Sequence, residues 1–200
     1  MKRFVNESTA FLLLLSFFEG GAVMAVELMG AKLIAPYYGG SLYVWAAILA
    51  LTLGGLAAGY FLGGRLSLRT PRRATPLVIV AVSALWVGAL PLLAPVVLEA
   101  TLGMGLRRGI VTGGLVLVFP PLLLFGMVSP LIVRLISRTE GRTGHAAGVV
   151  YTVSTLGGIL VTFLAAFFFI PHMGLAATAY VTATLLACFP LAAFVAYKAA

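Results

Sequence analysis

The chain has 200 residues, of which 62% are hydrophobic and only 9% are charged, and its formal net charge is +8. Soluble domains carry roughly 25% charged residues, so this composition excludes an ordinary soluble protein and leaves no segment for a soluble catalytic domain. Because the basic residues lie in short segments between apolar runs, the positive charge does not indicate nucleic-acid binding. We expect an all-α, polytopic membrane protein whose single transmembrane domain covers residues 1–200.

Six apolar segments are each close to the length of about 20 residues that a helix needs to cross a hydrocarbon core of about 30 Å. We predict helices at about residues 9–33, 41–64, 76–98, 109–133, 146–170 and 175–197, with short turns at 36–40 and 171–174. The first apolar run continues past Glu19 without a small-residue cleavage site, so we interpret it as a retained helix and not as a signal peptide. Pro120, Pro121 and Pro130 predict a kink or break in the fourth helix.

The distribution of Lys and Arg predicts the orientation of the chain. Cytoplasmic loops carry an excess of these residues, and an even number of spans places both termini on the same side. That side would carry most of the 13 basic residues, namely Lys2, Arg3, Arg65, Arg69, Arg72, Arg73, Arg134, Arg138, Arg142 and Lys198. The opposite side would carry Lys32, Arg107 and Arg108. We therefore predict a multi-pass protein of the cell inner (plasma) membrane, with both termini cytoplasmic and the arginine loops against anionic lipid.

The first helix carries two acids inside an otherwise apolar run. At about 1.5 Å per residue, Glu19 lies roughly 15 Å from Thr9, near the membrane midplane, and Glu27 lies roughly 12 Å further along. A charged side chain at the bilayer centre costs at least about 2.5 kcal/mol, so it normally faces protein or water. Glu19 is therefore a candidate for binding a cationic amine or relaying a proton. The alternative is a protonated carboxyl group that hydrogen-bonds to a neighbouring backbone group or hydroxyl.

Glu27 is the second candidate. It lies about 80° around the helix from Glu19, so we expect both acids to line one broad cavity. Two carboxylates about 12 Å apart would suit a diamine or triamine with separated ammonium groups. The alternatives are an ion pair with Lys32, for which a spacing of five residues gives poor geometry, or an interhelical pair with Arg107 or Arg108.

Two further groups of residues are candidates for lining a binding site. Aromatic residues gather at the outer ends of the first two helices: Tyr37, Tyr38, Tyr43 and Trp45. They indicate either an aromatic belt at the membrane interface or a cage for an ammonium group. Polar residues give the fifth helix one polar face: Tyr151, Thr152, Ser154 and Thr155. These side chains could line a cavity that faces Glu19, or they could form hydrogen bonds between helices.

Several kinds of chemistry lack the residues they need. The sequence has no Asp, one cysteine, Cys188, in an apolar run, and two histidines, His145 and His172, in loops predicted on opposite sides. We therefore expect no disulfide within the chain, no metal site and no cofactor, and a Ser–His–Asp triad is excluded.

Glycine patterns suggest how the helices pack. Gly59 and Gly63 have the four-residue spacing that lets two helices approach closely. A Leu-Gly-Gly run occurs at residues 53–55 of the second helix and again at 156–158 of the fifth. This match suggests a three-plus-three inverted repeat, which is an arrangement typical of transporters.

Three stretches carry a resemblance to a known family. They are FFEGGAVMAVELMGAKLIAPYYGGSLYVWAAILALTLGGLAAGYFLGGRLS (17–67), FPPLLLFGMVSPLIVRLI (119–136) and GHAAGVVYTVSTLGGILVTFLAAFFFIPHMG (144–174). The matching features are Glu27, Gly64-Arg65 at the end of the second helix, Pro130-Leu131, and the segment Gly148 to Gly157 with Tyr151 and Thr155 in their slots. With these features, nearly the whole chain resembles the membrane portion of the spermidine-synthase-like integral membrane proteins of bacteria and archaea, also known as fused spermidine synthases.

The resemblance implies polyamines as the substrate class. Members of that family commonly continue into a cytoplasmic Rossmann-type aminopropyltransferase domain, whereas these 200 residues contain no G-x-G-x-x-G after a predicted strand. The resemblance therefore does not carry aminopropyl transfer over to this polypeptide. We predict a transporter-like protein that binds or moves a small cationic or amphipathic solute. The alternatives are a structural or assembly subunit, as a homo-oligomer or beside another membrane protein or a separate soluble synthase, and an intramembrane enzyme with Glu19 as acid or base.

Overall fold

The computed structural model describes residues 2–69, 72, 74–140 and 143–199. Arg73 and Arg142, which the orientation argument uses, lie outside these residues. Within the described ranges every regular element is helical, as predicted. In chain order the elements are α1 (Lys2–Tyr38), α2 (Leu42–Arg69), α3 (Ala74–Thr101), η1 (Leu102–Met104), α4 (Leu106–Leu117), α5 (Phe119–Glu140), α6 (Thr143–Leu164), η2 (Ala165–Phe169) and α7 (Ile170–Ala199).

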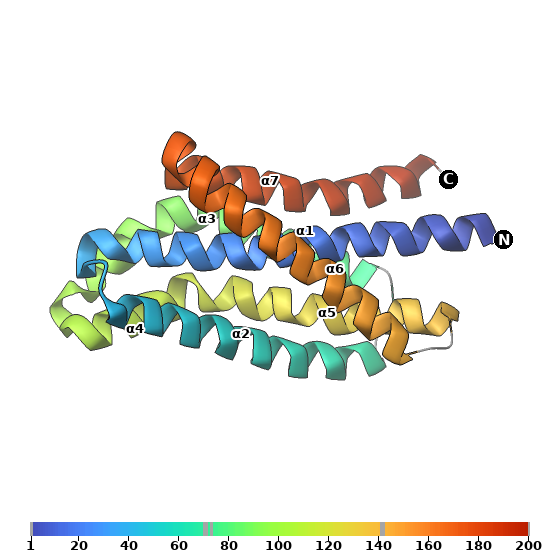
Figure 1. The fold of residues 1–200 in the computed structure, drawn as a ribbon, viewed down its shortest axis with the longest axis horizontal. Coiled ribbons are helices and arrows are strands. Elements are labelled where there is room, and N and C mark those ends of the chain that lie inside the picture. The colour runs from blue at the N-terminus through green and yellow to red at the C-terminus, as the bar shows by residue number, and fades with distance from the viewer. Residues whose placement is uncertain (1, 70–71, 73, 141–142, 200) are drawn as a thin grey trace.

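Five helical segments of the described chain are long and apolar enough to cross a membrane. The last of them, Thr143–Val195, is far longer than one crossing needs. Its helical path breaks at Gly174, whose φ of 80° and ψ of 172° are not helical. Figure 1 shows α6 and the longer part of α7 running in opposite directions on the two sides of this break. The predicted turn at 171–174 therefore falls where the chain reverses.

The end of α1 differs from the prediction. The turn expected at 36–40 begins only at Gly39, whose φ is 80°, and Pro36 lies inside the helix. A proline inside a helix removes one backbone hydrogen bond. Here Ile34 and Tyr38 are buried in the core on either side of it, and their packing holds the last turns together. Tertiary contacts thus extend this helix beyond Pro36, the residue that was expected to end it.

The break predicted in the fourth span lies at Val118, between α4 and α5. Pro121 has no N–H group to donate to the carbonyl group of Leu117, so that carbonyl loses its helical partner. The indole Nε1 of Trp86, on α3, donates a hydrogen bond to this oxygen at 3.1 Å. A side chain from the neighbouring helix therefore satisfies the backbone group that the proline leaves free.

Three helix pairs dominate the packing: α1 with α6, α2 with α5, and α3 with α7 (Figure 1). Glycines make the first two pairs close. A Cβ atom on Gly59 would collide with the backbone of α5 at Leu123, and one on Gly157 would collide with the backbone of α1 at Phe17. By contrast, a Cβ on Gly64 would have no heavy atom within 4 Å. The predicted packing role thus holds for Gly59, with its partner Gly63, and not for every glycine of the second helix.

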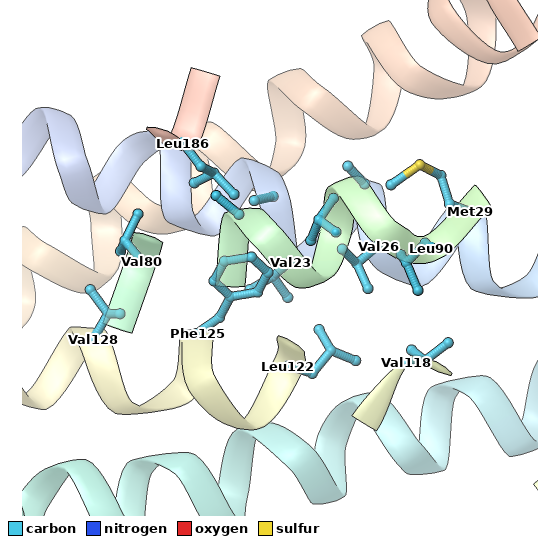
Figure 2. Close-up of a cluster of buried hydrophobic side chains, with 14 of the residues drawn as sticks. Val23, Val26, Met29, Val80, Leu90, Val118, Leu122, Phe125, Val128 and Leu186 are labelled. Atoms are coloured by element: carbon cyan, nitrogen blue, oxygen red, sulfur yellow. The ribbon is translucent and has the colours of Figure 1, made fainter. Parts of the chain in front are cut away.

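The hydrophobic core surrounds α1, which contacts all the other long helices of the described chain. Figure 2 shows the centre of this core, where Val23 and Val26 of α1 lie among Val80 of α3, Phe125 of α5 and Leu186 of α7. All five side chains are at least 90% buried. Among the segments that could span a membrane, the one that carries Glu19 and Glu27 is therefore the most buried.

Candidate functional site

Glu19 lies inside the bundle with only 2% of its surface exposed. Its carboxylate oxygen Oε2 accepts a hydrogen bond of 3.4 Å from the hydroxyl group of Ser154 on α6. The hydroxyl group of Ser129, on α5, is a second hydrogen-bonding partner of the same carboxyl group. Three helices thus meet at this side chain, and both of its partners are neutral hydroxyl groups.

The glycine after Glu19 explains why α6 reaches it. A Cβ atom on Gly20 would collide with the backbone carbonyl group and the side chain of Ser154. One turn earlier, the hydroxyl group of Ser16 donates a hydrogen bond of 3.2 Å to the backbone carbonyl of Val150. The sequence Glu19-Gly20 therefore combines an acid with a close helix contact. This contact brings the hydroxyl group of Ser154 within hydrogen-bonding distance of the Glu19 carboxyl group.

A cavity of about 340 Å³ opens beside Glu19, between α1, α2 and α6. This volume is at the small end of the range for ligand pockets. Its polar lining consists of Glu19, Tyr60, Ser154, Thr155 and Thr162. Its other lining residues are apolar, and none of the residues that line it is Lys, Arg or His. The cavity therefore combines one carboxyl group, several hydroxyl groups and an apolar wall.

Tyr60 is a site residue that the sequence analysis missed. It lies on α2, lines the cavity, and is close enough to interact electrostatically with both Glu19 and Tyr151. Its phenolic hydroxyl group was overlooked because its neighbours in the predicted second helix are apolar. The available signal was a tyrosine in the middle of a Gly- and Leu-rich apolar run.

The mouth of the cavity lies on the outside of the bundle. Tyr60 is 42% exposed, Ile159 is 52% exposed and Phe163 is 60% exposed. These residues come from the middle of α2 and the second half of α6, which are not packed against each other along their lengths. In Figure 1, α6 crosses in front of α1 at an angle and moves away from α2 towards its C-terminal end. The opening is thus a lateral one between two helices.

Glu27 does not join Glu19 at this cavity. It is half-buried and is not among the lining residues, although it lies on the same helix. A polar neighbour of its carboxyl group is Thr52 of α2, which is only 1% exposed. The hydroxyl group of Thr52 has no hydrogen-bond partner of ordinary geometry, so it lies near the carboxyl group of Glu27 without bonding to it. The two acids that the sequence analysis placed in one cavity therefore have separate surroundings.

Tyr37 also lies apart from Glu19, roughly 27 Å further along α1. Its side chain is half-buried against the core, and the neighbouring Tyr38 is buried. The hydroxyl group of Tyr38 donates a hydrogen bond of 2.8 Å to the hydroxyl oxygen of Thr101 on α3. The guanidinium group of Arg107 lies 5.6 Å from the ring centre of Tyr43. These aromatic residues connect helix ends and belong to a different part of the molecule.

The polar face predicted on α6 is divided by the fold. Thr155 lines the Glu19 cavity, together with Ser154 and Thr162. Thr152 is exposed and lines a separate surface hollow beside His145. Tyr151 is 45% exposed and reaches the site only through its electrostatic interaction with Tyr60. Of the candidate residues that the sequence analysis named, Glu19, Ser154 and Thr155 line this cavity.

In the described part of the chain, no three His, Cys, Asp or Glu side chains come together as ligands for a metal ion. The arrangement at Glu19 instead suits hydrogen bonding and charge pairing with one small cationic group. A carboxyl group accepts hydrogen bonds from an ammonium group, and hydroxyl groups can complete the contacts.

Comparison with protein-family models, with curated proteins and with solved structures gives no match for this chain. The relation to the spermidine-synthase-like proteins therefore stays a prediction from the sequence motifs. The geometry around Glu19 is what the functional argument can use.

Proposed function

We propose that this chain is a transporter-like membrane protein that binds a small cationic or amphipathic solute at Glu19. One observation carries the proposal: a carboxyl group that is 2% exposed lies beside a cavity of about 340 Å³ whose lining holds no cationic side chain. The hydroxyl groups of Ser154, Thr155 and Tyr60 line the same space. This combination matches the shape and chemistry of a site for one ammonium group.

The physical reason is the cost of charge in a membrane. An unpaired carboxylate at the predicted depth of Glu19 is expensive, so a proton or a cation must neutralise it. Among the described residues that line the cavity, no Lys, Arg or His can do so. A cationic solute would supply the missing charge, and the cavity would supply the space for it.

We also propose that six spans are arranged as an inverted three-plus-three repeat, and two helix contacts with the same glycine spacing support a repeat. In the pairs α1·α6 and α2·α5, each helix contributes one glycine to the contact. Each of these glycines lies against the residue of the partner helix that comes three positions before the partner's own glycine. The four approaches are Gly157 on Phe17, Gly20 on Ser154, Gly59 on Leu123 and Gly126 on Leu56. The two contacts thus share one glycine spacing, and the proposed repeat takes α5 as the counterpart of α1 and α2 as the counterpart of α6.

This register differs from the one that the sequence suggested. The Leu-Gly-Gly match makes Gly157 equivalent to Gly54 in the other half, whereas the close approaches make Gly157 equivalent to Gly59. In the contact-based register, Leu56 corresponds to Ser154 and Tyr60 corresponds to Gly158, and all four residues line the cavity. The cavity therefore lies where the two proposed halves meet, which is where transporters with inverted repeats bind their substrates.

Six spans and the arginine distribution favour both termini on the cytoplasmic side of the plasma membrane. The prediction can be checked in intact cells that carry the Cys188→Ser change. A cysteine in place of Gly103, in η1, should react with a membrane-impermeant maleimide added outside. A cysteine in place of Arg72 should react only after the cells are opened, and the reverse pattern would overturn the orientation.

The solute-binding proposal is tested by titrating purified protein in lipid nanodiscs with hexylamine and with spermidine. Glu19→Gln keeps the shape of the side chain but removes its charge, and we expect about 10- to 100-fold weaker binding of the amine. Glu27→Gln is the matched control, because Glu27 lies on the same helix outside the cavity, and it should change binding by less than about twofold. Wild-type affinity in the Glu19→Gln variant would overturn the proposal. Equal losses in both variants would instead support the polyamine reading, with both acids as anchors.

A further inference from the structure

We infer that the solute reaches Glu19 from the bilayer, through the lateral opening between α2 and α6, and that it is an amphiphile with one ammonium head and one alkyl chain. This inference rests on the proposed role of Glu19 in binding a cation. It goes further because it assigns the route of access and restricts the substrate class.

The position of the cavity mouth supports entry of the solute from the bilayer. Tyr60, Ile159 and Phe163 are between 42% and 60% exposed. Tyr60 lies well inside α2, and Ile159 and Phe163 lie in the last turns of α6, where the helical path continues through η2. In a spanning helix, such outward-facing residues lie against acyl chains and not against water. A molecule already dissolved in the bilayer therefore meets the opening directly, whereas one in water does not.

The walls of the cavity define the class of solute. The carboxyl group of Glu19 and its hydroxyl neighbours form the inner end, where Glu19 is 2% exposed. Met24, Leu56, Ile159 and Phe163 supply apolar lining. An ammonium head would lie at the polar inner end and its hydrocarbon chain would lie along the apolar lining towards the mouth. The phenol ring of Tyr60, which lies near Glu19, offers the head a cation–π contact as well.

A polyamine fits this route poorly. It carries several charges, and each must leave water before the molecule can pass an opening surrounded by hydrocarbon. The cavity also holds one carboxyl group, because Glu27 lies outside it. One anionic anchor matches one cationic head, so the second and third ammonium groups of a polyamine would have no carboxylate partner among the described residues that line the cavity.

The route is tested with radiolabelled dodecylamine dissolved in the nanodisc lipid, with association followed by scintillation proximity. Ile159→Trp narrows the mouth, and we expect association to slow at least tenfold. Leu160→Trp is the matched control, since Leu160 is 48% exposed on the same helix but does not line the cavity, and its rate should stay at the wild-type value. Ile159→Ala widens the mouth and should bind at the wild-type rate or faster, which separates access from misfolding.

The substrate class is tested by competition against the labelled amine. Referred to the free concentration in water, each methylene added between hexylamine and dodecylamine should lower the half-competing concentration by about fourfold, because it moves more of the amine from water into the hydrocarbon from which it enters the cavity. Unlabelled 1-dodecanol, which lacks the charge, should compete equally with wild-type protein and with Glu19→Gln. Spermidine added to the water should compete at least 100-fold more weakly than dodecylamine.

Two outcomes would overturn the inference alone. The first is wild-type association in Ile159→Trp, and the second is spermidine that competes as well as dodecylamine while Glu19→Gln still weakens amine binding. Wild-type dodecylamine binding in Glu19→Gln would overturn the proposed function as well. The two failures are therefore distinguishable in one set of measurements.

Discussion

The helix pairs α1·α6 and α2·α5 pack in the same way but place different side chains beside the contact. In both, glycines bring the two backbones together with the same spacing. The residue before Gly20 is Glu19, which is 2% exposed and hydrogen-bonded to hydroxyl groups, whereas the residue before Gly126 is Phe125, which is fully buried in the core. The comparison teaches that one packing device can build either a polar site or an apolar core. The side chains beside the glycines decide which.

The two pairs also differ in the continuity of their helices. The helix α1 is unbroken from Lys2 to Tyr38, whereas the predicted fourth span, which includes α5, is divided at Val118 into α4 and α5. The break is stabilised from outside by Trp86, through its bond to the carbonyl group of Leu117. The acid is thus on the unbroken helix.

The largest expected effect on stability is at Phe125, the residue that is compared with Glu19. Phe125→Gln would leave a cavity in the core and an amide without a partner, so we expect the free energy of unfolding to fall by about 3–5 kcal/mol. Glu19→Gln replaces one hydrogen-bonding group by another of the same shape, so stability should change by less than about 1 kcal/mol. Thermal unfolding in detergent measures both. Similar losses at the two positions would show that Glu19 is part of the structural core and not of a binding site.

The next effect tests whether the two glycine contacts are equivalent. Gly59→Leu and Gly157→Leu both force a side chain into the facing backbone, and each should lower the free energy of unfolding by about 3 kcal/mol. Gly64→Leu is the control, because a Cβ atom there meets no heavy atom within 4 Å. Melting temperatures of the three variants give the comparison. A large loss for only one of the first two variants would contradict a matched pair of contacts.

The smallest expected effect on stability concerns the break at Val118, which α1 lacks. Trp86→Phe keeps an aromatic ring but removes the donor to the carbonyl group of Leu117, so it should lower the free energy of unfolding by about 1–2 kcal/mol. Trp45→Phe is the control, since Trp45 is 37% exposed on α2. If both variants melt at the same temperature, the bond from Trp86 does not stabilise the break.

Local sequence features predicted the elements that local chemistry controls. The lengths of the apolar runs predicted the long helices, Pro120 and Pro121 predicted the break now seen at Val118, and Gly174 marks the predicted reversal. Glu19 stood out because an acid is costly in an apolar run. Pro36 misled the prediction of the end of α1, because the burial of Ile34 and Tyr38 outweighs one missing hydrogen bond.

The members of the site were harder to predict, because they come together from different helices. A helical wheel places Glu19 and Glu27 about 80° apart, which is compatible with a shared cavity. Their surroundings are nevertheless separate, since Ser154 faces one and Thr52 faces the other. Tyr60 was missed for the same reason: its sequence neighbours are apolar, and only packing brings it near Glu19.

The sequence by itself determined that this chain forms apolar helices, where several of them break, and that one helix buries an acid whose charge needs a partner. These features follow from hydrophobicity, backbone geometry and the cost of charge, which act on each segment separately. The tertiary structure alone decided that the acid lies beside a lateral cavity with hydroxyl groups from α6 and a tyrosine from α2. Contacts between helices depend on which faces meet, and that is settled only when glycines let particular backbones approach.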